Sequence, residues 1–234
     1  MTVGLFVVFI WALAFLSATV LHRQLEELLS EQQLASTRRV AGQLDTRLKE
    51  NIDGLERAAA GLPEDLSHET IQPLLARRPY LHIAFSGGIA LIGLDGVTIA
   101  DYPVAPGRRG TYFGDRDYFR KVVETGKPYI DQPIIGRALQ RPVLTTAVPV
   151  FAADGRLRAV MTGITDLTAP NFLGFVADRT QTGAGEYFVM SLRDNIIVAA
   201  TDSKRSLQPS PARGRNLLYD RMADGFEGSG VAVS

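Results

Sequence analysis

The sequence predicts an α+β protein in which an N-terminal transmembrane helix and a long stalk helix precede antiparallel sheets. Three observations support this prediction. Residues 2–21 contain no charged side chain, and residues 23–60 form a long run without proline. In the rest of the chain, short apolar runs alternate with turn sequences such as Asp95-Gly96 and Asp154-Gly155, which are typical of β-hairpins. A helical region followed by a region of strands favours an α+β architecture.

The composition sets limits on size, partners and chemistry. The chain has 234 residues, of which 46% are hydrophobic, enough to bury the core of one or two domains. Its 25 basic and 25 acidic residues give a formal net charge of zero, so nucleic acid is not an expected partner. Cysteine is absent and only three histidines are present, which excludes disulfides, thiolate nucleophiles and a cysteine- or histidine-rich metal site. No cofactor is predicted.

Residues 2–21 are the core of the first predicted element, an anchor at residues 1–22. A helix of this length rises about 30 Å, the thickness of the hydrocarbon core of a bilayer. A cleaved signal peptide is the alternative, and the small residues Ser17-Ala18-Thr19 lie near a possible cleavage position. A signal peptide would have a shorter apolar core behind a basic segment, and no Lys or Arg lies between Met1 and the apolar run. An uncleaved anchor in the lipid bilayer is therefore predicted.

Residues 23–62 are predicted to form a long amphipathic helix and its end. Leucine or valine recurs at intervals of roughly three to six residues from Leu25 to Leu48, and helix-favouring residues dominate. The Gly61-Leu62-Pro63 sequence ends the helix. Because the spacing is only loosely heptad, a strict coiled coil is not predicted. The pattern suits a stalk that leaves the membrane and packs along a domain, and a plain core helix has the same pattern.

A sheet-forming region follows, at residues 63–170. Its predicted elements are, in order, a helix over 67–77, strands over 81–85, 89–94 and 97–100, a polar loop over 101–114, a helix over 117–125 ended by Gly126, an extended segment from Tyr129, and strands over 143–151 and 157–164. The strands are expected to pair as an antiparallel meander that a helix and loops interrupt. Loops gathered on one face of such a sheet can form a pocket.

Residues 171–234 are predicted to begin a second module of the same kind. Strands over 186–191 and 196–200, joined by a turn at 193–195, repeat the strand–turn–strand arrangement of the first module. A further strand is predicted to open at 228–234, where the pattern stops. We therefore expect the chain to be a fragment of a longer protein and its second module to be incomplete.

The chain resembles the double-Cache family, most specifically over residues 115–167. The motifs that carry the resemblance are, in order, Asp115-Arg116-Asp117-Tyr118-Phe119-Arg120, Gly126-Lys127-Pro128-Tyr129-Ile130-Asp131, Gly136-Arg137, Arg141-Pro142-Val143-Leu144-Thr145-Thr146-Ala147-Val148-Pro149-Val150, Asp154-Gly155-Arg156-Leu157 and Gly163-Ile164-Thr165-Asp166-Leu167. The resemblance implies two stacked PAS-like antiparallel-sheet modules carried by the long helix. It implies that a ligand binds the membrane-distal module, at 63–170, and that residues 171–234 belong to the membrane-proximal one.

The resemblance also implies a function. Double-Cache domains are periplasmic or extracellular sensors of chemoreceptors, histidine kinases and diguanylate cyclases. The expected protein is therefore a homodimeric receptor of the bacterial inner membrane that binds a small molecule, with residues from about 23 onward outside the cytoplasm. Residues 214–230 resemble family members that continue into a domain that synthesises cyclic di-GMP.

The resemblance implies a set of ligand-binding residues, which are Arg116, Tyr118, Tyr129, Asp131 and Asp166. In the amino-acid-binding branch of the family, Arg116 would grip a carboxylate with its planar fork, and Asp166 would receive an ammonium group. Tyr118 and Phe119 stand where that branch tends to have Trp and Tyr. The ligand is therefore expected to be an organic acid or an amino acid, with both classes open.

These residues also have purely structural interpretations. Arg116 could cap the start of a helix, and Asp131 and Asp166 could be turn residues at strand ends. Four further arginines are interpreted as surface or solvated loop charges: Arg108, Arg109, Arg137 and Arg141.

Two other classes of function compete with a sensor. An enzyme is disfavoured because the chain contains no G-x-S-x-G, H-E-x-x-H, P-loop or Rossmann motif, so no catalytic residue is predicted. A structural or dimerising stalk is compatible with the long helix and could coexist with sensing.

Overall fold

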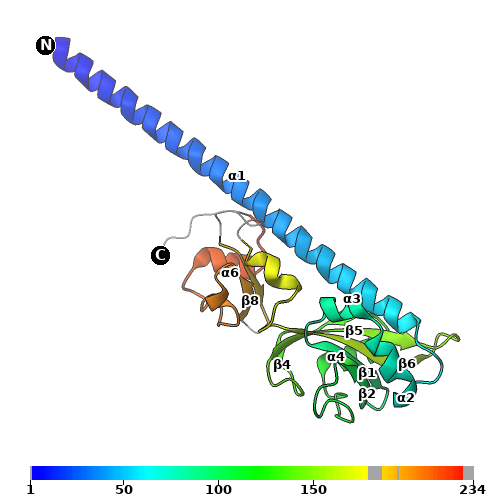
Figure 1. Ribbon diagram of the computed structural model, residues 1–234. Coiled ribbons are helices and arrows are strands. Elements are labelled where there is room, and N and C mark those ends of the chain that lie inside the picture. The colour runs from blue at the N-terminus through cyan, green and yellow to red at the C-terminus, as the bar shows by residue number, and fades with distance from the viewer. Residues whose placement is uncertain (1, 179–185, 194, 229–234) are drawn as a thin grey trace. The chain divides into compact units, whose positions relative to one another are not determined.

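The computed structural model describes residues 2–178, 186–193 and 195–228, without the side chains of residues 2–10, 12–14, 22–23, 25–27 and 203. Residues 42–210 form one compact unit, and the described residues of 2–41 and 211–228 belong to a second. Figure 1 shows the elements of both. The mixture of helices and antiparallel sheets confirms the predicted α+β class.

The N-terminal element is a single helix, α1 (Thr2–Ala60), of 59 residues. It includes both the predicted anchor and the predicted stalk, and it ends directly before Gly61, as the sequence predicts. Most side chains of the predicted anchor lie outside those that the structure describes. Among the described residues, no helix is both long enough and apolar enough to span a bilayer. The anchor at residues 2–21 stays a prediction.

An antiparallel sheet forms the centre of the unit at residues 42–210. Its strand order is β2-β1-β6-β5-β3, and β4 also pairs with β5. The strands are β1 (Gly88–Gly93), β2 (Thr98–Tyr102), β3 (Tyr129–Ile130), β4 (Ile134–Ile135), β5 (Pro142–Phe151) and β6 (Leu157–Asp166). Most residues of β1, β5 and β6 are buried. Burial on both faces explains why these strands read as nearly continuous apolar runs.

The two predicted Asp-Gly turns join β1 to β2 and β5 to β6. Gly96 and Gly155 have φ angles of 79° and 82°, in the left-handed region that glycine adopts without steric cost. The preceding aspartates fix the turns with their side chains. Asp95 Oδ1 accepts a hydrogen bond from the backbone N–H of Val97 at 3.0 Å, and Asp154 makes the matching bond in the second turn.

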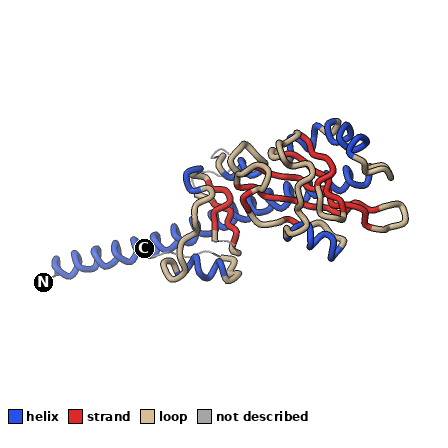
Figure 2. The backbone as a smooth tube through the Cα atoms, turned by 90° about the horizontal axis from the view of Figure 1, so that it is seen from below, coloured by secondary structure: helices blue, strands red, loops and turns tan. Residues whose placement is uncertain are grey.

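The sheet carries a core on each of its faces, and Figure 2 shows its strands together with the helices around them. The last turns of α1 pack on one face together with α2 (His68–Ala76) and α3 (Pro79–Ala84), around a cluster that includes Leu91. The other face is covered by α4 (Asp117–Thr125), around a cluster that includes Ile92. Leu91 and Ile92 are neighbours on β1 and point to opposite faces, as the two-residue period of a strand requires. The predicted helices at 67–77 and 117–125 are confirmed.

The predicted strand over 81–85 is wrong, because these residues lie in and directly after helix α3. Pro79 occupies the first turn of α3, where the N–H that proline lacks would have no helical partner. Leu81 and Phe85 are four residues apart, so both lie on the same side of the turn, and both are buried. A five-residue apolar run does not distinguish a short helix from a strand, which explains the error.

The remaining elements follow β6. A 3-10 helix, η1 (Phe172–Val176), comes first. Strand β7 (Phe188–Ser191) then pairs with β8 (Ile196–Ala200) as the predicted second hairpin. Asn195 in its turn has a φ of 51°. A short 3-10 segment η2 (Ser203–Arg205) and helix α6 (Leu217–Ala223) come next, and the sequence did not predict them. The strand predicted at 228–234 lies almost entirely outside the described residues.

Candidate functional site

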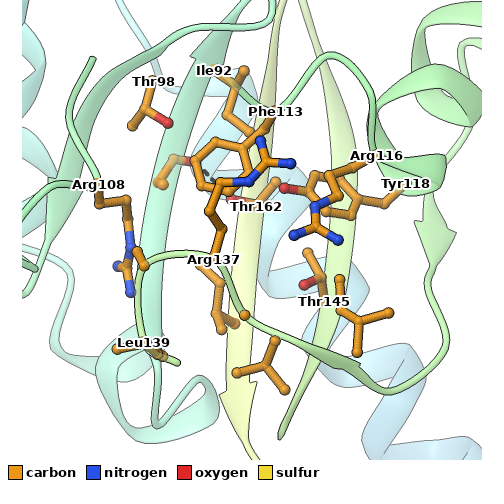
Figure 3. A pocket seen from close by; sticks show the side chains of 16 residues that line it. Ile92, Thr98, Arg108, Phe113, Arg116, Tyr118, Arg137, Leu139, Thr145 and Thr162 are labelled. Atoms are coloured by element: carbon orange, nitrogen blue, oxygen red, sulfur yellow. Dashed lines mark hydrogen bonds between the residues drawn. The ribbon is translucent and has the colours of Figure 1, made fainter. Parts of the chain in front are cut away.

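The candidate site is a cavity on the α4 face of the sheet (Figure 3). It is small, with a volume of about 40 Å³, which lies below the usual range of about 300–1,000 Å³ for small-molecule sites. Strands β1, β5 and β6 supply Ala90, Ile92, Val143, Thr145, Thr162 and Ile164. Strands β2 and β4, helix α4 and the surrounding loops supply Thr98, Arg108, Phe113, Arg116, Tyr118, Ile134, Gly136, Arg137, Ala138 and Leu139. The walls are largely apolar, with three arginines among them.

Arg108 comes from the loop that follows β2 and is almost fully buried, with 3% of its surface exposed. Its Nη2 donates a hydrogen bond to the carbonyl oxygen of Gly87 at 2.9 Å. Its Nη1 has no hydrogen-bond partner among the described residues. This nitrogen lies 3.6 Å from a carboxylate oxygen of Asp101, which is also buried. Burial lowers the pKa of Arg108 and Asp101 opposes this shift, and the guanidinium stays charged because the pKa of arginine is so high. A buried cation thus faces the cavity with a nitrogen to spare.

Arg116 is the residue directly before α4, with extended backbone angles. Its side chain does not cap the helix, so the structural interpretation of this residue has no support from a cap bond. Its Nε is buried and has no hydrogen-bond partner among the described residues. The guanidinium lies on the opposite side of the cavity from Arg108 (Figure 3).

Arg137 comes from the loop between β4 and β5 and is held in place by residues of another loop. It binds both carboxylate oxygens of Asp115, at 2.8 and 3.2 Å, and also donates to the backbone carbonyl oxygen of Tyr112. Its guanidinium lies 5.5 Å from the centre of the Phe113 ring. Arg137 therefore ties two loops together over the cavity, and Asp115 offsets its charge.

Tyr118 lies in the first turn of α4 and is buried against the cavity. Burial is the main cause that raises the pKa of its phenol above the ordinary value. The hydroxyl therefore stays protonated and can donate a hydrogen bond to a ligand. Of the five predicted ligand-binding residues, the structure places Arg116 and Tyr118 in the wall of the cavity.

Asp131 directly follows β3 and lies beside the cavity without lining it. Its backbone N–H donates to Thr145 at 2.8 Å, and its Oδ1 accepts from the backbone N–H of Gln132 at 2.9 Å. The side chain is buried, and this burial raises the pKa of the carboxyl group, while backbone hydrogen bonds from Gln132 and Tyr118 oppose the shift. Asp131 therefore stands next to two wall residues, Tyr118 and Thr145.

The raised pKa of Asp131 predicts a pH-dependent effect of Asp131→Asn. A carboxyl group whose pKa is higher in the folded chain stabilises the fold at low pH, and that contribution is lost as the pH rises through the raised pKa. Asparagine does not titrate, so the Tm of the variant relative to the native chain should rise as the pH goes from about 4 to about 7. Thermal unfolding followed by circular dichroism at several pH values measures this.

Asp115→Asn is the matched control with the opposite sign. The hydrogen bond from Arg137 holds the pKa of the Asp115 carboxyl below its ordinary value. The Tm of this variant relative to the native chain should fall mainly as the pH rises to about 4, and it should change little above that, because a lowered pKa gives its pH dependence below the ordinary pKa of Asp. A Tm difference between Asp131→Asn and the native chain that does not change with pH would contradict the prediction.

Asp166 and Tyr129 lie outside the cavity wall. Asp166 ends β6, where its Oδ1 accepts from the backbone and hydroxyl of Thr168 at 2.8 and 2.6 Å and its Oδ2 pairs with Arg141 at 3.2 Å. Burial alone would raise its pKa, but the bonds from Thr168 and Arg141 outweigh this and lower it. Tyr129 packs at the edge of the cluster around Ile92.

The sequence interpretation missed Arg108 and Arg137. Arg108 was interpreted as surface but is buried, and Arg137 was interpreted as a solvated charge but lines the cavity. Arg141 is 61% exposed, as a loop charge would be. A charged residue in a Gly-rich loop has no periodic pattern around it, so nothing in the sequence shows whether the loop folds over a site. In the part of the chain that the structure describes, no group of His, Asp and Glu side chains could hold a metal ion.

Comparison with solved structures identifies the fold. The ligand-binding domain of the amino acid chemoreceptor PctB from Pseudomonas aeruginosa PAO1, in complex with L-Gln, has a TM-score of 0.57 and 23% identity, covering 75% of this chain and 69% of its own. The corresponding domain of the chemoreceptor CtaA from Pseudomonas fluorescens, in complex with L-isoleucine, has a TM-score of 0.56 and 18% identity over 74% and 68% of the two chains. Both are double-Cache sensor domains. The chain has a double-Cache fold.

A third matching structure is longer than this chain. An extracellular ligand-binding receptor from Desulfohalobium retbaense has a TM-score of 0.63 and 18% identity, over 83% of this chain and 35% of the receptor. No family model and no curated protein matches the chain. The double-Cache resemblance over residues 115–167 is therefore confirmed at the level of the fold. The residues that line the cavity come from the segment of the chain that begins with β1 and ends with β6.

Proposed function

We propose that the chain is the extracytoplasmic sensing region of a bacterial membrane receptor, and that its cavity binds a small organic acid or amino acid. The observation that carries the proposal is Arg116. Its guanidinium stands in a largely apolar cavity, and its buried Nε has no hydrogen-bond partner in the part of the chain that the structure describes. A buried donor without a partner costs free energy, so such a group is expected to gain a partner when a ligand binds.

A carboxylate is the group that best fits this arginine. The planar guanidinium donates two parallel hydrogen bonds to the two oxygens of a carboxylate. Tyr118 adds a protonated hydroxyl, and Thr145 and Thr162 add two more. Asp131 reaches the ligand in this proposal only if the wall at Tyr118 moves, whereas Tyr129 and Asp166 act by supporting the surrounding strands.

The proposal extends to how the receptor is arranged. Residues 2–21 anchor it in the inner membrane, residues 63–170 form the membrane-distal module and residues 171–234 the beginning of the proximal one. Two copies associate as a homodimer. Ligand binding shifts an equilibrium between two arrangements of the receptor, which requires that the ligand bind one arrangement more tightly than the other. The output domain is a diguanylate cyclase, a histidine kinase or a chemoreceptor signalling domain.

A structural stalk without a ligand is the second candidate function. Leu28 and Leu29 of α1 are 64% and 55% exposed, so α1 carries apolar side chains that could pack against a second helix. Both functions can belong to one protein. They differ in whether a small molecule stabilises the fold.

A thermal-shift screen separates the two functions. The full 234-residue chain in detergent is heated with small organic acids and amino acids, each beside its own primary amide. A sensor should gain about 2.7 kcal/mol at a hundredfold excess over Kd, which raises Tm by several degrees, and the amides should have little effect. A chain whose Tm no carboxylate raises would be a stalk, and the proposed function would fail.

A further inference from the structure

We infer that the ligand carries two anionic groups held apart by a short spacer and has no ammonium group. This inference rests on the proposed function, because it names the class of ligand that the same cavity takes. It follows from where the unpartnered donors of the cavity lie and from which charges its wall contains.

Two unpartnered nitrogens lie on guanidinium groups at opposite sides of the cavity. Nη1 of Arg108 and Nε of Arg116 are both buried, and neither has a hydrogen-bond partner among the described residues. Figure 3 shows the two side chains on either side of the sheet strands that form the floor. One carboxylate between them could satisfy one nitrogen, whereas two anionic groups could satisfy both.

Thr98 strengthens the case for the second group. Its hydroxyl is also buried without a hydrogen-bond partner, and it lies on the Arg108 side of the cavity in Figure 3. A carboxylate or phosphate oxygen on this side of the cavity could accept a hydrogen bond from Thr98. Asp101 already offsets part of the charge of Arg108, so the second group gains hydrogen bonds there more than net Coulomb attraction.

The charges of the wall disfavour an ammonium group. The sixteen residues that line the cavity include three arginines and no aspartate or glutamate. The nearby carboxylates of Asp101 and Asp115 are engaged with Arg108 and Arg137, and Asp131 is buried and does not line the cavity. An ammonium group would therefore enter beside cations without a carboxylate to receive it, and like charges in a cleft repel.

Isothermal titration of the full chain in detergent tests the inference with matched probes. Succinate, glutarate and adipate vary the spacer, succinamate replaces one carboxylate by a neutral amide, and aspartate adds an ammonium group to succinate. 3-Phosphopropionate replaces one carboxylate by a phosphate-type anion. The best dicarboxylate should bind about tenfold more tightly than its monoamide, and its amino derivative should bind at least about tenfold more weakly, each factor corresponding to one lost or opposed charged contact.

Variants of Arg108 locate the second group. In Arg108→Met the preference for the dicarboxylate over the monoamide should disappear, while the monoamide keeps its affinity through Arg116. Arg108→Lys keeps the charge without the planar fork and should retain part of the preference, which guards against a folding defect of the methionine variant. Arg156→Met removes an exposed arginine of the β5–β6 turn and should change nothing.

The outcomes separate the inference from the proposed function. Tighter binding of aspartate than of succinate, or an unchanged preference in both Arg108 variants, would overturn the inference and leave a carboxylate sensor. Absence of binding by every acid and amino acid would overturn both.

Discussion

Arg116→Ala is expected to abolish the ligand-induced rise in Tm without unfolding the protein. The side chain of Arg116 does not cap α4, and its Nε has no hydrogen-bond partner among the described residues. Its cation stands at the N-terminal end of α4, where the helix dipole disfavours positive charge. The unliganded Tm should therefore stay the same or rise slightly. Each charged hydrogen bond to a ligand is worth roughly 1.5–3 kcal/mol, so the loss of a two-bond contact should weaken binding about a hundredfold or more.

Two further variants serve as comparisons for Arg116→Ala. Arg116→Lys keeps the charge and loses the fork, so its affinity should lie between those of the native chain and the alanine variant. Arg120→Ala, near the same end of α4, removes an exposed arginine whose ion pair with Asp117 is screened by solvent, and it should leave binding intact. A ligand-induced Tm rise that survives in Arg116→Ala would sink the assignment of the site.

Asp101→Asn is expected to destabilise the fold by about 3–5 kcal/mol, the cost of leaving a buried charge without its counter-charge. Asp101 and Arg108 are both almost fully buried, at 1% and 3% exposure. Asparagine can still accept the hydrogen bond that Asp101 Oδ2 takes from the backbone N–H of Ala105 at 2.8 Å. The loss should therefore come from the charge alone. Urea unfolding of the full chain measures it, provided that the slope with denaturant stays unchanged.

Asp154→Asn is the matched control for Asp101→Asn. The distance between Asp154 and Arg156 is 3.7 Å, close to the 3.6 Å between Asp101 and Arg108. Both members of the Asp154–Arg156 pair are exposed. Replacement of Asp154 should cost much less than that of Asp101, because solvent screens an exposed ion pair. The double variant Asp101→Leu with Arg108→Met should recover most of the stability, because removal of both charges leaves neither unpaired. Equal costs for Asp101→Asn and Asp154→Asn would show that burial adds nothing to the pair.

The individual elements were largely predictable because their signals are local, whereas the predicted meander is wrong because β1 pairs with β6. The Asp-Gly turns, the apolar strands between them and the glycine that ends α4 all act within a few residues, and each is confirmed. The error at 81–85 has the same origin, since five apolar residues fit a helix and a strand equally well. Only the packing of Leu81 and Phe85 beneath the sheet decides between them.

The site was predictable only in part. Arg116 and Tyr118 belong to a motif whose order can be read from the sequence, and both line the cavity. Arg108 and Arg137 lie in loops, and their roles depend on partners that fold against them from elsewhere. Asp115 lies far from Arg137 in the sequence, and no periodicity connects the two. Loop conformation is set by such long-range contacts, so the charge of the cavity became clear only from the structure.

The pairing of β1 with β6 has a consequence for how the protein folds. Gly88 pairs with Ile164, so two adjoining strands of the cavity floor come from opposite ends of the sheet-forming segment. The loops that carry Arg108 and Arg137 lie between β1 and β6 in the chain, as does α4. Contacts between residues so distant in sequence form slowly. A nascent chain that still lacks β6 cannot form the cavity, because β6 supplies part of its wall. Ligand should therefore act after the rate-limiting step, slowing unfolding while leaving the folding rate unchanged.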